Sequence, residues 1–187
     1  MRETRDRILD VAIDVLGRRP DAGMGDVAAA AGVVRRTVYG HFPSRSDLVL
    51  ALTRRAVDEM AAVLAETSAG ARVPDQAWAD FVGRLWPLVH RYRVLVVLRR
   101  GEFGEEIHAL LGPVETGIAD LVARGQEQGV FGRHLPPDVL GRVAWSAVFA
   151  IADVAAPTLD GAAVTTASLL LLGVPRERAA ALAEGVG

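Results

Sequence analysis

Residues 31–48, with the sequence AGVVRRTVYGHFPSRSDL, constrain the fold more than any other part of the chain. Gly32 ends a short alanine-rich helix, because glycine can adopt the left-handed conformation that a sharp turn requires. We expect the next helix at residues 35–41, with Val38 and Phe42 spaced four apart and facing the core together. This pattern predicts the turn and the second helix of a helix-turn-helix motif.

A well-marked exit follows this short helix. Pro43 cannot continue it, because proline lacks a backbone N–H and clashes with the preceding turn. Ser44 is placed to cap the next helix, and Asp47 follows three residues later, as in a capping box. That helix is predicted to run from about Arg45 to Thr67. It is too long to serve the helix-turn-helix alone, so we expect it to pass from one domain into the next.

The helix predicted at residues 35–41 has an unusual polar face. Five side chains are left pointing largely outward: Arg35, Arg36, Thr37, Tyr39 and His41. Arginines and hydroxyls on a protruding helix suit phosphate oxygens and base edges. We expect Arg35, Arg36 and Thr37 to meet base edges, and Tyr39 and His41 to meet the DNA backbone. A solvated polar face is the alternative interpretation.

Residues 4–60 resemble the DNA-binding domain of TetR-family transcriptional repressors. The matching residues keep the family's order and spacing: Ile8, Ala12, Leu16, Val27, Ala28, Ala31, Gly32, Val33, Thr37, Val38, Tyr39, His41, Phe42, Ser44, Arg45, Asp47 and Leu48. The chain shows no period-two strand pattern, so we expect an all-α protein of about nine or ten helices. We expect a helix-turn-helix DNA-binding domain at residues 1–47 and a ligand-binding and dimerisation domain at residues 48–187. Arg45 stands where the family commonly has lysine, and we expect it to hold a phosphate.

Two positions depart from the family pattern. Gly23 stands where the second helix usually opens with serine or threonine, so no hydroxyl is offered to a phosphate. Val34 stands where the family often has serine at the start of the recognition helix. These departures favour a second hypothesis, an all-α small-molecule-binding or interaction protein whose DNA-binding half has degenerated. The arginines of residues 35–45 favour the first hypothesis, a ligand-responsive repressor.

Further helices are predicted over the rest of the chain, at about residues 75–91, 92–100, 105–111, 113–128, 137–155, 160–173 and 176–184. Proline at position 113 is expected to begin a new helix. The helices at 137–155 and 160–173 mix alanine, serine and glycine with large aliphatic residues, a surface that two chains could share. We expect a homodimer there, because helix-turn-helix proteins bind paired half-sites about 34 Å apart. An intramolecular core is the alternative.

Aromatic and histidine side chains of the second domain are candidates to line an inducer cavity. They are Trp78, Phe81, Trp86, His90, Phe103, His108 and Trp145, with His90, Arg93, His108 or Glu115 as possible polar anchors. The resemblance implies that a small, largely apolar ligand binds between these helices and moves the helix that begins at Arg45. The protein would then be released from a pseudo-palindromic operator. Ordinary core aromatics are the alternative for each residue.

The composition excludes several other kinds of site. The chain has 51% hydrophobic but only 5% aromatic residues, which favours close helix packing, and it contains no cysteine. Its four histidines (41, 90, 108 and 134) lack metal-ligand spacing. No nucleophile elbow, phosphate loop or zinc helix motif occurs. We therefore expect no metal, no cofactor and no enzymatic activity.

Charge and hydropathy agree with these expectations. The net charge of −2 divides into +3 over residues 1–55 (10 arginines, 7 acids) and −5 over residues 56–187 (11 arginines, 16 acids). A mildly basic end on an acidic body is typical of a DNA-reading module joined to another domain. The chain opens on a charged amphipathic pattern, and its apolar runs are shorter than the roughly 20 residues that span a bilayer. We expect a cytoplasmic protein without a membrane partner.

Overall fold

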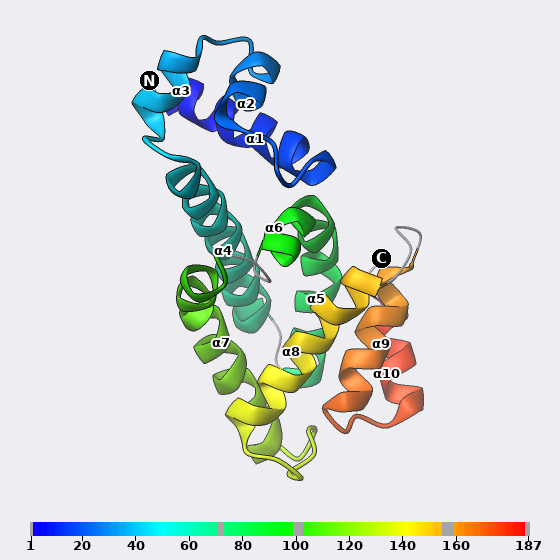
Figure 1. The fold of residues 1–187 in the computed structure, drawn as a ribbon. Helices are drawn as coiled ribbons and strands as arrows, with labels where there is room; N and C mark the ends of the chain where they lie inside the picture. The colour runs from blue at the N-terminus through cyan, green and yellow to red at the C-terminus, as the bar shows by residue number, and fades with distance from the viewer. Residues whose placement is uncertain (1, 71–72, 99–102, 155–158, 186–187) are drawn as a thin grey trace. The chain divides into compact units, whose positions relative to one another are not determined.

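The computed structural model describes residues 2–70, 73–98, 103–154 and 159–185, and throughout these ranges the regular structure is helical, without strands (Figure 1). This confirms the predicted all-α class. The ten helices are α1 (Arg2–Arg18), α2 (Met24–Ala30), α3 (Arg35–His41), α4 (Arg45–Gly70), α5 (Pro74–Arg91), α6 (Arg93–Leu98), α7 (Gly104–Glu127), α8 (Pro137–Val154), α9 (Gly161–Leu171) and α10 (Arg176–Glu184).

The chain divides into two compact units. The first comprises Met1–Val57 and Arg91–Leu110, and the second comprises Asp58–His90 and Leu111–Gly187. The first unit therefore contains all of residues 1–47 and also a segment from later in the sequence. An acidic side chain of α1 helps to explain this, since Asp10 pairs with Arg55 at 2.8 Å and with Arg91 at 3.2 Å.

The first unit is built on the packing of α1, α2 and α3 (Figure 1). Apolar side chains from all three helices are buried, including Ile8, Val27 and Val38, each of which is fully inaccessible to solvent. Gly32 has φ +64°, the left-handed conformation predicted for the turn between α2 and α3. Phe42 is buried at the end of α3, so the predicted inward pair of Val38 and Phe42 is confirmed.

Two helix boundaries differ from the predicted ones. One uninterrupted helix, α7, runs through Pro113, although proline was expected to begin a new helix there. Ala109, whose carbonyl loses its helical donor, is exposed, as is Pro113, so water can satisfy that carbonyl. The helix α4 ends at Gly70, three residues beyond the predicted Thr67. The helix predicted at 92–100 corresponds to α6, and its last two residues lie outside the described ranges.

The second unit has an aromatic core. The rings of Phe81 and Trp145 stack with centroids 5.8 Å apart, and Trp78 and Phe149 meet this pair edge-on, at 6.2 Å from Phe81 and 4.6 Å from Trp145. The helices α8, α9 and α10 pack in sequence order, α8 on α9 and α9 on α10. None of the described helices has the length and apolar character needed to cross a membrane.

An ion pair between a buried carboxylate and an exposed arginine fixes α10 within this unit. Asp75, at the start of α5, is 3% exposed and accepts hydrogen bonds from Arg178 of α10, with Nε 2.9 Å from Oδ2. Its other oxygen accepts from the backbone N–H of Gln76 at 2.8 Å. The hydrogen bond to Asp75 raises the pKa of Arg178. Removing one partner of such a pair leaves a buried polar group unsatisfied, so the contact ties α10 to the start of α5.

Candidate nucleic-acid interface and ligand pocket

The short helix α3 presents the polar face that the sequence predicts. Arg35, Arg36 and Tyr39 are exposed, and Tyr39 has 49% of its surface accessible. Thr37 and His41 are half-buried. All five side chains belong to a helix that is anchored by buried apolar residues on its opposite face. This arrangement leaves charged and hydroxyl groups free to meet an extended anionic surface.

A side chain caps the helix that follows α3, whereas α3 itself begins without a side-chain cap. The Ser44 Oγ accepts a hydrogen bond from the Asp47 N–H at 3.1 Å and donates to the Asp47 carboxylate at 2.6 Å, so the predicted cap of α4 forms. At the other end, Val34 is the N-cap residue of α3 and makes no side-chain hydrogen bond. Val34 is 69% exposed. The N-terminus of α3 is therefore uncapped and apolar.

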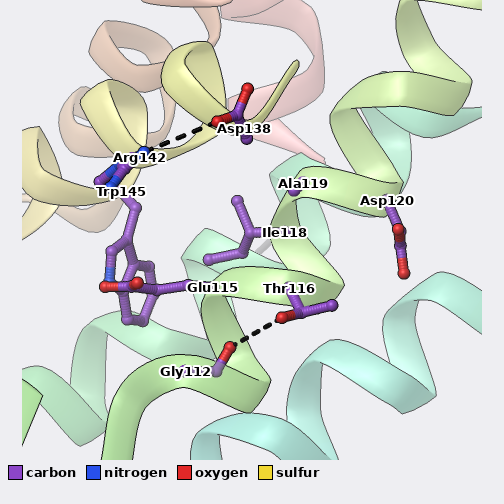
Figure 2. A pocket seen from close by; sticks show the side chains of 9 residues that line it. All are labelled: Gly112, Glu115, Thr116, Ile118, Ala119, Asp120, Asp138, Arg142 and Trp145. Atoms are coloured by element: carbon purple, nitrogen blue, oxygen red, sulfur yellow. Dashed lines mark hydrogen bonds and ion pairs between the residues drawn. The ribbon is translucent and has the colours of Figure 1, made fainter. Parts of the chain in front are cut away.

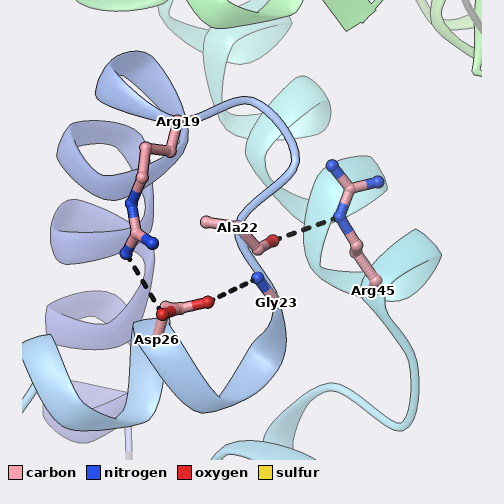
Figure 3. Close-up of polar contacts among 5 residues, drawn as sticks. All are labelled: Arg19, Ala22, Gly23, Asp26 and Arg45. Carbon is pink, nitrogen blue, oxygen red and sulfur yellow. Dashed lines mark hydrogen bonds and ion pairs between the residues drawn. The ribbon is translucent and has the colours of Figure 1, made fainter.

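A polar network holds the start of α2 (Figure 3). The Gly23 N–H donates to Asp26 Oδ2 at 2.9 Å, and Arg19 Nη2 donates to Asp26 Oδ1 at 3.1 Å. These hydrogen bonds, that from Gly23 first and that from Arg19 second, lower the pKa of the Asp26 carboxyl below its ordinary value. Asp26 thus supplies the return half of a capping box at a position where glycine offers no side chain.

Arg45 contacts the protein itself. Its Nε donates to the Ala22 carbonyl at 3.4 Å (Figure 3). Its Nη2 donates to the Pro20 carbonyl, so the guanidinium holds the loop between α1 and α2. The guanidinium carbon also lies 5.6 Å from the centroid of the Phe103 ring. Arg45 is half-buried. These contacts link the start of α4 to the α1–α2 loop and to the segment before α7.

Arg35 folds back over α2. A Cβ added at Gly25 would lie 2.3 Å from Arg35 Nη2, so the guanidinium passes directly above the glycine backbone. The charge of Arg35 also contributes to lowering the pKa of Asp26. The absence of a side chain at Gly25 therefore sets the direction that Arg35 takes from α3.

The side chains predicted to line a ligand cavity lie in both units. Trp78, Phe81 and Trp86 are buried in the second unit, where the Trp78 Nε1 donates to Ser168 Oγ at 3.0 Å and the Trp86 Nε1 donates to the Leu159 carbonyl at 3.2 Å. His90, also in the second unit, is half-buried and packs edge-on against the Trp86 ring, with the ring centroids 4.5 Å apart. Two of the predicted lining residues belong to the first unit instead, where Phe103 is buried and His108 is exposed.

A cavity of about 340 Å³ lies between α7 and α8 in the second unit (Figure 2). Trp145 and Glu115, both singled out from the sequence, are part of its lining. Three further charged residues line it and were not predicted: Asp120, Asp138 and Arg142. Its volume is at the lower end of the roughly 300–1,000 Å³ typical of small-molecule sites. Across the described residues, no cluster of side chains suited to a metal ion occurs.

The solvent-facing sides of α8 and α9 are apolar. They carry small and aliphatic side chains at helical spacing, all half-buried or exposed: Val143, Ser146, Ala147, Ala150 and Val154 on α8, and Ala163, Thr166, Ala167, Leu170 and Leu171 on α9. Val154 is 83% exposed and Val143 is 44% exposed. Large aliphatic side chains repeated along one helix face are unfavourable in water, so such faces mark interaction surfaces.

Sequence reasoning missed the internal contacts of Arg45 and the network around Asp26. The three-residue spacing from Gly23 to Asp26 is that of a capping box and could have indicated the hydrogen bond between these two residues. No sequence signal joins Arg45 to a loop more than 20 residues earlier. The charged lining at positions 120, 138 and 142 likewise becomes visible only once α7 and α8 are placed side by side.

Comparison with known proteins shows that this chain is similar to bacterial regulatory proteins. Residues 8–52 match the family model for bacterial regulatory proteins of the tetR family. The HTH-type transcriptional repressor LfrR of Mycolicibacterium smegmatis is 53% identical over 55 residues, which are 29% of each protein. The HTH-type transcriptional regulator AcrR of Shigella flexneri is 44% identical over 48 residues, 25% of this chain and 22% of AcrR. The aligned sequence thus spans less than a third of either relative.

The likeness to a solved structure extends much further along the chain. The crystal structure of LfrR from Mycobacterium smegmatis in complex with proflavine has a TM-score of 0.73 and 29% sequence identity, covering 91% of this chain and 94% of LfrR. Residues 8–52, which contain the helix-turn-helix of α2 and α3, thus match the tetR family of bacterial regulatory proteins, and the helical fold of the described residues is similar to that of LfrR.

Proposed function

We propose that this protein is a sequence-specific DNA-binding transcriptional repressor that a small, largely apolar ligand releases from a pseudo-palindromic operator. The exposed polar face of α3 carries this proposal, because Arg36 and Tyr39 are exposed on a helix whose other face is buried, and the exposed Arg35 lies over α2 beside them. Arg35, Arg36 and Thr37 would meet base edges. Tyr39 and His41 would meet the DNA backbone.

Arg45 could contribute to DNA binding in either of two ways. A phosphate contact would require its guanidinium to share or leave the carbonyls of Pro20 and Ala22. The same side chain can also act indirectly, by holding the loop that precedes α2. These two roles predict different dependences on salt, which an affinity measurement distinguishes.

We further propose that the protein binds its operator as a homodimer formed through α8 and α9. The apolar faces of these two helices support this proposal, since two copies could bury them against each other. One helix-turn-helix unit buries little surface on DNA, and pairing places two recognition helices about one helical turn, roughly 34 Å, apart. The domain division at residues 47 and 48 is part of the same proposal, with residues 48–187 serving ligand binding and dimerisation.

Ligand release is proposed to act through α4. This helix runs from Arg45 to Gly70, so its first part belongs to the first compact unit and its last part to the second. LfrR, which is similar in fold, was crystallised with proflavine. To empty the operator, a ligand must favour the state that does not bind DNA by a few kcal/mol.

The decisive experiment is selection of bound sites from random DNA, followed by affinity measurements over a range of salt. Replacing Arg36 by alanine should weaken binding by about 1–3 kcal/mol if it reads a base, with relaxed specificity at one position of each half-site. Arg124→Ala is a matched control, because Arg124 is an exposed arginine on α7 in the second unit. If no enriched sequence emerges, the degenerate DNA-binding alternative suggested by Gly23 and Val34 replaces this proposal.

A further inference from the structure

The indole nitrogen of Trp145 differs from those of the other two tryptophans. Trp145 is 2% exposed, and its Nε1 has no hydrogen-bond acceptor among the described residues. Trp78 and Trp86 both donate to an oxygen of the protein. Leaving a buried N–H group without an acceptor is energetically unfavourable, because the group has lost its hydrogen bond to water. Because Trp145 lines the cavity between α7 and α8, an acceptor from a bound molecule is able to satisfy it.

Glu115 supplies the second recognition group. It is half-buried, lines the same cavity, and makes no hydrogen bond or ion pair within the part of the chain that the structure describes. The other charged side chains are less suited to a ligand near Trp145. Arg142 and Asp138 pair with each other, with Nη2 3.7 Å from Oδ2, and Asp120 points away from Trp145 (Figure 2).

The charge of the lining indicates the sign of the ligand. Three carboxylates and one guanidinium surround the cavity, and the guanidinium is paired with one of the carboxylates. An uncompensated carboxylate in a partly desolvated site favours a positively charged partner. The side chain of Ile118 and the indole of Trp145 contribute apolar surface beside these groups.

We propose that this cavity binds a small organic amine that also carries a hydrogen-bond-accepting oxygen. The protonated nitrogen pairs with Glu115, the oxygen accepts from Trp145 Nε1–H, and the apolar body lies against Ile118. The inference concerns the ligand of the proposed regulator, so its regulatory meaning rests on the proposed function. Binding itself depends only on the second compact unit, which contains all three residues.

Nuclear magnetic resonance of the full chain labelled with ¹⁵N-tryptophan tests this assignment. The three indole N–H signals are assigned with Trp145→Phe, and 2-amino-1-phenylethanol is the probe. The Trp145 signal should move downfield on addition of the probe, while those of Trp78 and Trp86 stay in place, because their acceptors belong to the protein. Two truncated probes, 2-phenylethanol without the amine and 2-phenylethylamine without the hydroxyl, should each bind at least about tenfold more weakly.

A matched pair of variants separates the carboxylate of Glu115 from the general charge of α7. Glu115→Gln should weaken binding of 2-amino-1-phenylethanol at least about tenfold, whereas Glu127→Gln, which removes an exposed carboxylate of α7 outside the lining, should leave it within about twofold. Unchanged Trp78 and Trp86 signals in both variants establish that the fold is intact. A Trp145 signal that ignores the probe overturns the inference. An upfield shift of that signal in Glu115→Gln without the probe also overturns it, because Glu115 would then be the acceptor.

A mobility shift against selected operator DNA separates this inference from the regulatory proposal. Weakened operator binding in the presence of 2-amino-1-phenylethanol supports both the cavity assignment and the regulatory proposal. Binding of the probe with unchanged operator affinity supports the cavity assignment and contradicts its role as the inducer site. Failure of the unliganded protein to bind any DNA contradicts the proposed function, and the resonance measurements stand independently of it.

Discussion

Replacing Arg45 by alanine should loosen the first compact unit. The substitution removes hydrogen bonds from a charged donor to the carbonyls of Pro20 and Ala22, together with the contact on the Phe103 ring. Hydrogen bonds of this kind contribute roughly 1.5–3 kcal/mol each in favourable cases, and a cation–π contact contributes about 0.5–1 kcal/mol. Because Arg45 is half-buried and the carbonyls can be rehydrated, we expect a loss of about 2 kcal/mol in total.

Hydrogen exchange measured by mass spectrometry is the appropriate assay, since all three tryptophans lie in the second unit and fluorescence would not report this loss. A loss of about 2 kcal/mol corresponds to roughly 30-fold faster exchange of the most protected amides in peptides from residues 8–52. Tryptophan fluorescence serves as the control and should not change. Arg45→Lys should exchange more than about tenfold faster than wild type, because an ammonium cannot contact both carbonyls and the ring together.

The salt dependence of operator binding distinguishes two roles of Arg45, holding the α1–α2 loop and holding a DNA phosphate. If Arg45 acts by holding the loop, Arg45→Ala lowers the affinity but leaves the slope of log affinity against log salt unchanged. If Arg45 instead holds a phosphate, the slope becomes shallower by about one unit. Unchanged hydrogen exchange together with a shallower slope would refute the reasoning from these contacts.

Three further predictions test other parts of the molecule. Because its hydrogen bonds lower the pKa of Asp26, the stability that Asp26 provides is present above the unfolded value of about 3.9 and is lost as the pH falls through the lower folded value. Exchange of α2 amides in Asp26→Asn and wild type should therefore differ at pH 6 and converge toward pH 3. Gly25→Ala should displace the Arg35 guanidinium and change operator affinity by about threefold or more without unfolding α2, as binding and circular dichroism would show. Val143→Glu should shift the protein from dimer to monomer in sedimentation. A dimer of unchanged affinity would exclude the exposed face of α8 from the dimer interface.

Local patterns predicted the first unit well. The glycine turn at residue 32, the limits of α3 and the Ser44 cap depend on residues no more than four apart, so the sequence carries their whole cause. The burial of Val38 and Phe42 follows from their spacing on a helix. These are features in which backbone preference and side-chain pattern agree.

Features that depend on distant residues could not be predicted. Asp75 and Arg178 meet across 103 positions, and neither residue type nor spacing identifies them as partners. Pro113 was interpreted as a helix start because proline usually interrupts a helix, yet exposure on α7 removes much of that penalty. The aromatic residues were grouped by type, whereas the fold separates Phe103 and His108 from the tryptophans and leaves Trp145 beside Glu115.

The discontinuous make-up of the first unit has a consequence for transplanting its DNA-reading part. A fragment ending at Val57 keeps α1, α2 and α3 but omits Arg91, one of the two arginines on Asp10, and Phe103, the ring beneath Arg45. It also omits α6, which packs on α1. A chimera that contains only the amino-terminal stretch would therefore include α3 but lack the later residues that stabilise the first unit.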